Sequence, residues 1–292
     1  MPCYGPLTAY YSKDVSPTGK RPLVFDKRSS HSGIPIQIPC GQCVGCRLER
    51  SRQWAIRCMH EKLMHADAAF LTLTYSDECI PSNYSLKKRD LQLFMKRLRK
   101  VRPNGLRFFA CGEYGETTFR PHYHVLLFNT YFPDQKFHKM SGQNKLYVSA
   151  ELDGIWQNGN CTIGNVTFES CAYTARYAMK KITGPAADAF YGSREPEFLV
   201  MSRRPGIGTG YYEKYADQAY RHDTVVVDGR ESNIPRFYDT KFEGVDPERL
   251  AVLKSIRRKK AKLKKVDQTK RRRFDIERFE LLKQEFFKRK GV

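Results

Sequence analysis

Long hydrophobic runs are missing from this sequence, and none approaches the roughly 20 apolar residues that a membrane-spanning helix needs. The first six residues, MPCYGP, carry neither the basic region nor the apolar region of a secretory signal peptide. We therefore expect a soluble chain that is not secreted by that route. Its 292 residues, 40% of them hydrophobic, are enough for one large or two modest domains with real cores.

Acidic residues are also scarce. Asp and Glu number 31 against 52 Lys and Arg, which leaves a net charge of +21. Residues 247–292 alone hold 18 Lys and Arg against 6 Asp and Glu, a surplus of 12. Such an excess predicts a polyanionic partner, because binding a phosphate backbone releases its condensed counterions. Nucleic acid is favoured over an acidic membrane surface, because the apolar positions of this tail are few and interrupted.

Three regions follow from these patterns: a cysteine-rich segment over residues 1–62, a central domain over 63–240 and a basic helical tail over 241–292. Two clusters of cations in the tail are candidates for contact with a DNA backbone. They are Arg257, Arg258, Lys259 and Lys260, and Arg271, Arg272 and Arg273.

A disulfide framework is not expected, since nine cysteines are an odd number in a chain without a secretion signal. Three of them, Cys40, Cys43 and Cys46, are each separated by two residues, as in the tight turns of thiolate zinc sites. Either Cys3 or Cys58 completes four ligands for a structural zinc ion. An iron–sulfur cluster is disfavoured because the last cysteine of the ferredoxin pattern is missing. A loop of packed, reduced cysteines explains the cluster equally well.

The segment RPHYHVLLFN, residues 120–129, reads as a buried strand that begins with two histidines. Side chains two residues apart on a strand point to the same face, so His122 and His124 would stand side by side. The strand predicted over residues 106–113 ends in an acid, and a short connection favours a hairpin. We therefore expect Glu113, rather than Glu116 in the loop, beside the histidines. Two core histidines would give the same local pattern.

Two imidazoles and a carboxylate leave open positions on a metal, which is typical of catalytic sites. Mixed nitrogen and oxygen ligands suit Mg²⁺ or Mn²⁺ when phosphate oxygens complete the shell, with Zn²⁺ as the alternative. A cupin or iron-oxygenase site uses similar ligands. It does not account for the surplus of positive charge, so we give it less weight.

Residues 171–181, CAYTARYAMKK, favour a helix. Tyr173 and Tyr177 are then one turn apart on one face, and Lys180 and Lys181 follow one turn later. Two phenols and an ammonium group form a plausible set for phosphoryl transfer, provided that the phosphodiester is activated. Taken alone, a tyrosine pair at helical spacing more often packs in a core.

Two further local patterns give structural predictions. Residues 70–75 read as a strand, and Ser85 is placed to cap a helix whose apolar stripe is Leu91, Phe94, Met95 and Leu98. The glycine-rich residues 206–210 match no complete nucleotide fingerprint, so we expect a turn rather than a phosphate-binding loop.

In order along the chain, FLTLT at 70–74, HYH at 122–124 and a Tyr-x3-Tyr pair followed by two lysines resemble the three motifs of HUH endonucleases of the rolling-circle initiator type. The sequence is most similar to initiators of microviruses, in particular the gokushovirus branch. The cysteine cluster, CGEYG at 111–115 and MSRRPG at 201–206 are similar too. The resemblance covers roughly residues 1–215, and the motifs are specific only as an ordered set.

This resemblance implies an α+β fold: a central five-stranded antiparallel sheet with flanking helices, the ferredoxin-like (RRM-like) palm of HUH endonucleases. It also implies that one strand of an origin is nicked, with a tyrosine joined to the 5′ phosphate and a free 3′ hydroxyl. By position, His122 and His124 are metal ligands and Tyr173 and Tyr177 are nucleophiles. Some relatives carry lysine where this chain has Arg176, which leaves open the cation that assists.

The implied partners are single-stranded origin DNA and, in the bacterial host cytoplasm, a helicase and a DNA polymerase. The helicase would have to come from the host, because the sequence contains no Walker motif. The alternative from another class is a non-catalytic, basic DNA-binding protein whose histidines and cysteines only hold zinc.

Overall fold

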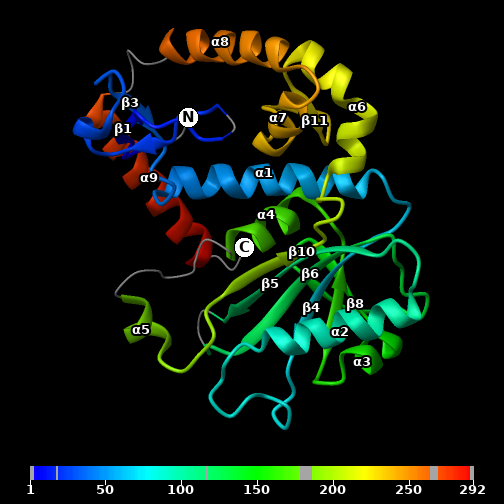
Figure 1. Cartoon of the computed structure of the whole chain (residues 1–292). Helices are drawn as coiled ribbons and strands as arrows, with labels where there is room; N and C mark the ends of the chain where they lie inside the picture. Colours follow the sequence, from blue (N-terminus) through cyan, green and yellow to red (C-terminus); the bar gives the residue numbers. More distant parts are fainter. Residues whose placement is uncertain (1–2, 18, 116–117, 178–185, 264–268, 290–292) are drawn as a thin grey trace. The chain divides into compact units, whose positions relative to one another are not determined.

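The computed structural model describes residues 3–17, 19–115, 118–177, 186–263 and 269–289 (Figure 1). The chain forms two compact units. One combines Met1–Arg50 with Ala251–Val292 and is called the split unit here; the other, Ser51–Leu250, is the sheet unit. Helix α1, Val44–Lys62, contributes its first residues to the split unit and the rest to the sheet unit.

The sheet unit contains a seven-stranded antiparallel sheet in the order β10-β5-β6-β4-β9-β8-β7. Its strands are β4 (Ala68–Thr74), β5 (Arg107–Tyr114), β6 (Pro121–Phe128), β7 (Lys136–Ser141), β8 (Asn144–Val148), β9 (Cys161–Gly164) and β10 (Phe198–Met201). Strands β5, β6, β4 and β9 are adjacent in that order, and a helix follows β4 and another precedes β9. That arrangement is the ferredoxin-like one, so the α+β prediction is confirmed.

The sheet has two strands more than the five predicted. The additional strands, β7 and β8, pair as a hairpin at the β9 edge. All six residues of β7 are exposed, and no residue of β8 is fully buried. Strands of this kind carry no alternation of hydrophobic and polar residues, which is the signal from which strands are predicted.

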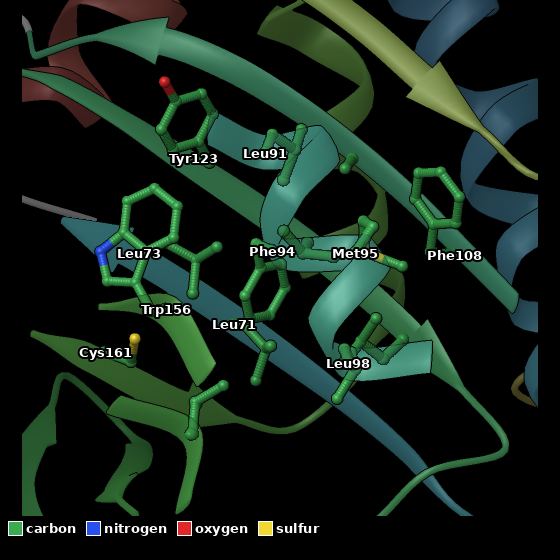
Figure 2. Close-up of a cluster of buried hydrophobic side chains, with 14 of the residues drawn as sticks. Leu71, Leu73, Leu91, Phe94, Met95, Leu98, Phe108, Tyr123, Trp156 and Cys161 are labelled. Atoms are coloured by element: carbon green, nitrogen blue, oxygen red, sulfur yellow. The ribbon is translucent and has the colours of Figure 1, made fainter. Parts of the chain in front are cut away.

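One face of the sheet builds the hydrophobic core. Along β4 every second residue is buried, including Leu71 and Leu73. Helices α2 (Lys88–Val101) and α3 (Ala150–Trp156) cover this face (Figure 2). The apolar stripe predicted for α2 is confirmed, since Leu91, Phe94, Met95 and Leu98 are all buried. Burying such side chains stabilises the fold by about 1.5 to 3 kcal/mol each.

The predicted cap of helix α2 is wrong. The helix begins at Lys88, and the residue that precedes it, Lys87, makes no side-chain capping bond. The Ser85 hydroxyl instead donates to the carbonyl of Leu86 and accepts from the backbone N–H of Glu195, 110 residues further along the chain. A long-range backbone partner of this kind cannot be read from local sequence.

The opposite face of the sheet is covered by the later part of α1 and by α4, Phe168–Tyr177. Trp54 of α1 packs on Phe109 of β5 with ring centroids 5.0 Å apart. The Ser51 hydroxyl donates to the carbonyl of Ala172, 2.7 Å away, and so joins α1 to α4. These contacts fix α4 over the β5–β6 hairpin. The remaining elements of the unit are α5 (Ala186–Tyr191), α6 (Thr209–His222), β11 (Val225–Val227), β12 (Arg230–Ser232) and α7 (Arg236–Glu243).

Within the glycine-rich segment, residues 206–208 form a turn, and residues 209 and 210 are the first of α6. The backbone N–H of Gly208 donates to the buried carboxylate of Glu61, which also pairs with Arg107. Gly208 has a φ of +82°, and a Cβ atom there would lie 2.6 Å from the Tyr238 hydroxyl oxygen. The N–H of Gly208 is therefore already used by a side-chain carboxylate of the protein.

The split unit holds a three-stranded antiparallel sheet in the order β2-β1-β3, a 3-10 helix at Lys27–Ser29, the start of α1 and the helices of the tail. The strands are β1 (Leu7–Tyr11), β2 (Leu23–Val24) and β3 (Ile36–Ile38). The tail is helical as predicted, in α8 (Pro247–Leu263) and α9 (Lys270–Arg289). Within the described ranges, every helix is too short or too polar to cross a lipid bilayer.

Candidate metal and nucleophile site

Strands β5 and β6 place a carboxylate directly opposite a histidine. Glu113 pairs with His122 across the hairpin, and His124 lies two residues further on the same face. The Nε2 atoms of His122 and His124 lie 2.6 Å and 3.0 Å from Oε1 of Glu113. The structure thus brings together the three residues that the sequence singled out as metal ligands.

The outer nitrogen of each imidazole has its own partner. Nδ1 of His122 lies 3.1 Å from the carbonyl oxygen of Arg120, and Nδ1 of His124 lies 3.1 Å from the hydroxyl oxygen of Thr72. The Phe70 ring stacks on His124, with centroids 5.3 Å apart. Metal-binding histidines usually have such an outer partner, which fixes the ring and leaves the lone pair on the inner nitrogen.

Sequence reasoning missed the roles of Thr72, Phe70 and the Arg120 carbonyl. Thr72 is opposite His124 in the β4–β6 register, and Phe70 is two residues away on the same face. The FLTLT motif indicated that Phe70 and Thr72 share a face, because side chains two residues apart on a strand point the same way. The register that aligns them with the histidine is a tertiary property.

The arrangement calls for a cation between the imidazoles and the carboxylate. When the Arg120 carbonyl accepts the Nδ1 proton of His122, the Nε2 lone pair faces Glu113. A lone pair and a carboxylate oxygen 2.6 Å apart repel each other unless a proton or a metal ion lies between them. Among the described residues, nothing bonds to the buried Oε2 atom of Glu113. An unpaired, buried carboxylate oxygen is costly, so this donor set fits a metal.

Burial and hydrogen bonding act against each other on these groups. Burial raises the pKa of Glu113, but with no metal bound the two imidazoles can donate to it from Nε2–H, and this outweighs burial and leaves the pKa below its usual value. Burial lowers the pKa of His124, against the opposing effect of Glu113. Both directions favour an ionised carboxylate and a neutral imidazole, which are the forms that bind metals.

Helix α4 brings a phenol to the same place. The Tyr173 hydroxyl lies 3.4 Å from Oε1 of Glu113, and its ring lies 5.1 Å from that of His124, edge to face. Tyr177 is the last residue of α4, and its side chain is outside what the structure describes. Lys180 and Lys181 also lie outside the described residues.

A second set of metal-ligating side chains lies in the split unit. The sulfur atoms of Cys3, Cys40, Cys43 and Cys46 all lie within 4.8 Å of one another. Cys58, the alternative fourth residue, is fully buried in the sheet unit instead, and burial raises the pKa of its thiol well above the usual value. The set therefore contains Cys3.

The cations singled out in the tail lie on two helices. Arg257, Arg258, Lys259 and Lys260 belong to α8, and Arg271, Arg272 and Arg273 belong to α9. Five of the seven are exposed, and Arg257 and Arg273 are half-buried. Exposed cations on such helices can contact phosphates, because binding to a nucleic-acid backbone needs only accessible positive charge.

The known proteins to which this chain is similar are phage replication-associated proteins. A model of the family "Replication-associated protein ORF2/G2P" matches residues 68–182, which include β4, β5, β6 and α4. The replication-associated protein VP4 of Bdellovibrio phage phiMH2K is 35% identical over 261 residues, covering 85% of this chain and 79% of the relative. The replication-associated protein ORF2 of Spiroplasma virus 4 is 32% identical over 225 residues, covering 70% and 68%.

A more distant relative, the replication-associated protein ORF4 of Chlamydia phage 1, is 26% identical over 211 residues, covering 69% of this chain and 52% of the relative. No solved structure matches the chain. The chain belongs to the family of phage replication-associated proteins, as a rolling-circle replication initiator of the microvirus type.

Proposed function

We propose that the protein starts rolling-circle replication as a metal-dependent endonuclease that cuts single-stranded origin DNA with a tyrosine nucleophile. One observation carries the proposal. Two imidazole nitrogens and a carboxylate oxygen converge on one point, and a phenol hydroxyl lies 3.4 Å from that carboxylate oxygen. This arrangement supports the proposal, because a phenol close to a bound metal could attack a phosphodiester that the metal activates.

The metal would be held by His122, His124 and Glu113. Three protein ligands leave coordination positions for phosphate oxygens, and a bound Mg²⁺ or Mn²⁺ ion would polarise the phosphodiester and neutralise charge that develops on it. Thr72 and the Arg120 carbonyl would keep the two imidazoles oriented.

In the proposed reaction the phenolic oxygen of Tyr173 attacks the phosphorus atom, and the bond between phosphorus and O3′ breaks. The phenolic proton passes to a water molecule, because the Glu113 carboxylate that this hydroxyl faces would be engaged in holding the metal. The departing O3′ takes up one proton from water, so the step consumes no net proton. The products are a 5′-phosphotyrosine and a free 3′ hydroxyl. Attack of a 3′ hydroxyl on the phosphotyrosine reverses the step and rejoins the ends.

We assign Tyr177 as the second nucleophile, and Lys180 and Lys181 as cations that steady the developing charge. Two tyrosines would let one hold the parental 5′ end while the other cuts the regenerated origin. Their helical spacing in the sequence supports this assignment.

The substrate in this proposal is single-stranded DNA at the replication origin, and the basic helices α8 and α9 add affinity for its backbone. The free 3′ hydroxyl is the primer that a host DNA polymerase extends. A host helicase supplies strand separation, because the sequence has no Walker motif.

The test is the covalent adduct itself. Full-length protein is incubated with an origin-bearing oligonucleotide and Mn²⁺ or Mg²⁺, and DNA-linked protein is measured after denaturation. Wild type should form the adduct, and EDTA should abolish it. The double change Tyr173→Phe and Tyr177→Phe should abolish it as well, whereas Tyr177→Phe alone should still form it through Tyr173.

Glu113→Gln tests the metal site, with Glu116→Gln, a change at the acid three residues later in the sequence, as its matched control. Changing a residue that only hydrogen-bonds to a metal ligand typically costs roughly 10- to 100-fold in activity. Glu113→Gln changes a ligand itself, so adduct formation should fall by more than that. Glu116→Gln should keep most of the adduct formation. If wild type forms no adduct with its own origin, the endonuclease proposal is contradicted. The alternative, a non-catalytic, zinc-containing DNA-binding protein, is then favoured. An undiminished adduct from the double tyrosine variant would place the nucleophile elsewhere.

A further inference from the structure

In the part of the split unit that the structure describes, there is almost no hydrophobic core. Among its described residues, the buried hydrophobic side chains are those of Cys3 and Ala9. The sheet unit, in contrast, buries a large continuous cluster of aliphatic and aromatic side chains. Small folds that bury little apolar surface usually depend on a disulfide or a structural metal for their stability.

The four sulfur atoms near the start of this unit are spaced as ligands of one ion. Those of Cys43 and Cys3 lie 4.0 Å apart, and all four lie within 4.8 Å of one another. With zinc–sulfur bonds of about 2.3 Å, tetrahedral geometry places ligand sulfurs about 3.8 Å apart. A disulfide bond would require about 2.05 Å, and all four residues are free cysteines.

Backbone N–H groups point at these sulfur atoms. The N–H of Cys40 donates to Sγ of Cys3, and the N–H of Cys43 donates to Sγ of Cys40, each over 3.3 Å. The N–H of Tyr4 donates to Sγ of Cys43 over 3.4 Å. A neutral thiol is a weak acceptor, whereas a thiolate accepts strongly. Several amides aimed at clustered sulfurs therefore indicate thiolates, and clustered thiolates require a cation.

We propose that Cys3, Cys40, Cys43 and Cys46 hold a structural Zn²⁺ ion that stabilises the split unit. The ligands come from the residue shortly before β1, from the segment after β3 and from the first turn of α1. Gly41, with a φ of +77°, provides the tight turn between Cys40 and Cys43. The ion would link the segment before β1 and the segment after β3 to the start of α1. This link would stabilise the unit in place of an apolar core.

Four protein ligands fill a tetrahedral zinc shell, so this site has no open position for a substrate. It is separate in sequence and in chemistry from the Glu113, His122 and His124 group, which offers nitrogen and oxygen ligands only. The proposal does not depend on the nuclease function.

The first test uses full-length protein in which His122 and His124 are both alanine, so that the other candidate metal site is disabled. Elemental analysis after extensive dialysis should find one zinc ion per chain. X-ray absorption at the zinc edge should show sulfur neighbours only, at about 2.3 Å. A metal-free protein, a shell with nitrogen or oxygen neighbours, or a disulfide within the cluster would overturn the proposal.

The second test compares Cys43→Ser with Cys79→Ser, a change at an exposed cysteine outside the cluster. Cys43→Ser should lose most of the zinc, and limited proteolysis with mass spectrometry should find new cuts between residues 3 and 43. Cys79→Ser should keep its zinc and its resistance to protease. Full zinc retention by Cys43→Ser would contradict the assignment. Cys43→His, which keeps a zinc-binding side chain, should recover part of the metal and so separate ligation from general misfolding.

Discussion

The hydroxyl oxygen of Thr72 lies 3.1 Å from Nδ1 of His124, on the strand next to the histidine strand. This contact is the outer support of a residue that is otherwise held by Glu113 and by the ring of Phe70. It joins the first motif of the sequence to the second. The FLTLT strand therefore has a defined task at the site besides its contribution to the core.

Thr72→Val should weaken metal binding while the fold is kept, because valine has nearly the same shape and lacks only the hydroxyl. We expect a 10- to 100-fold loss of Mn²⁺ affinity, measured by calorimetry, and recovery of cleavage at excess metal. Thr74→Val is the control, since the Thr74 hydroxyl binds the Asn160 carbonyl and no histidine. Equal losses from both variants would show that the effect is not specific to the histidine.

Removing charge from α9 should reduce affinity for DNA without changing the chemistry. With Arg271, Arg272 and Arg273 all changed to glutamine, the slope of log K against log salt for single-stranded DNA should fall by up to about 2. The arginine-to-lysine triple variant keeps the charge and should keep the slope. Both proteins should cleave normally at saturating DNA, and loss of cleavage in the glutamine variant alone would assign these residues to the chemical step.

His60 should make the protein less stable in acid. It is fully buried, accepts from the Tyr238 hydroxyl and donates to the Val226 carbonyl, and burial lowers its pKa to about 4. The unfolded chain takes up this proton near pH 6.5, so the stabilisation is complete above that pH and is lost as the pH falls toward 4. The loss amounts to about 3 kcal/mol.

The measurement is urea unfolding of wild type and of His60→Gln between pH 4 and pH 7. The variant should be less stable at pH 7, and the difference between the two proteins should shrink as the pH falls. Taking the difference cancels the other groups that titrate in this range. A constant difference across the range would show that His60 has the same pKa in the folded and unfolded states.

Two glycines at the start of α6 should respond in opposite ways to alanine. Gly208→Ala forces a side chain into a left-handed conformation and against the Tyr238 hydroxyl, so we expect about 2 kcal/mol of destabilisation. Gly210 is helical and its Cβ would meet only Met64 at ordinary contact distance, so Gly210→Ala should stabilise by up to about 0.8 kcal/mol. Thermal unfolding of the two variants measures this, and an unfolding temperature for Gly208→Ala at or above the wild-type value would contradict the clash.

The sequence predicted the elements of this site well because each has a strong local signal. The hairpin with Glu113 opposite His122 follows from two hydrophobic strands and a short connection. The stripe of α2 follows from helical periodicity. The chemical roles of these residues, and of Tyr173, stay predictions until an adduct is measured.

Other features depend on contacts that no local pattern contains. The hairpin β7–β8 has exposed side chains, and the true partner of Ser85 is a backbone group 110 residues away. Likewise, the N–H of Gly208 in the glycine-rich turn donates to Glu61, which lies 147 residues earlier in the chain. Local composition predicted the turn, but it could not identify the carboxylate.

The split unit draws its residues from both ends of the chain, Met1–Arg50 and Ala251–Val292. During translation the sheet unit, Ser51–Leu250, leaves the ribosome as one continuous segment and can fold at once. The residues up to Arg50 must wait for residues 251–292 before their unit is complete. A nascent chain therefore acquires its histidine, carboxylate and tyrosine cluster before helices α8 and α9 are available to complete the split unit.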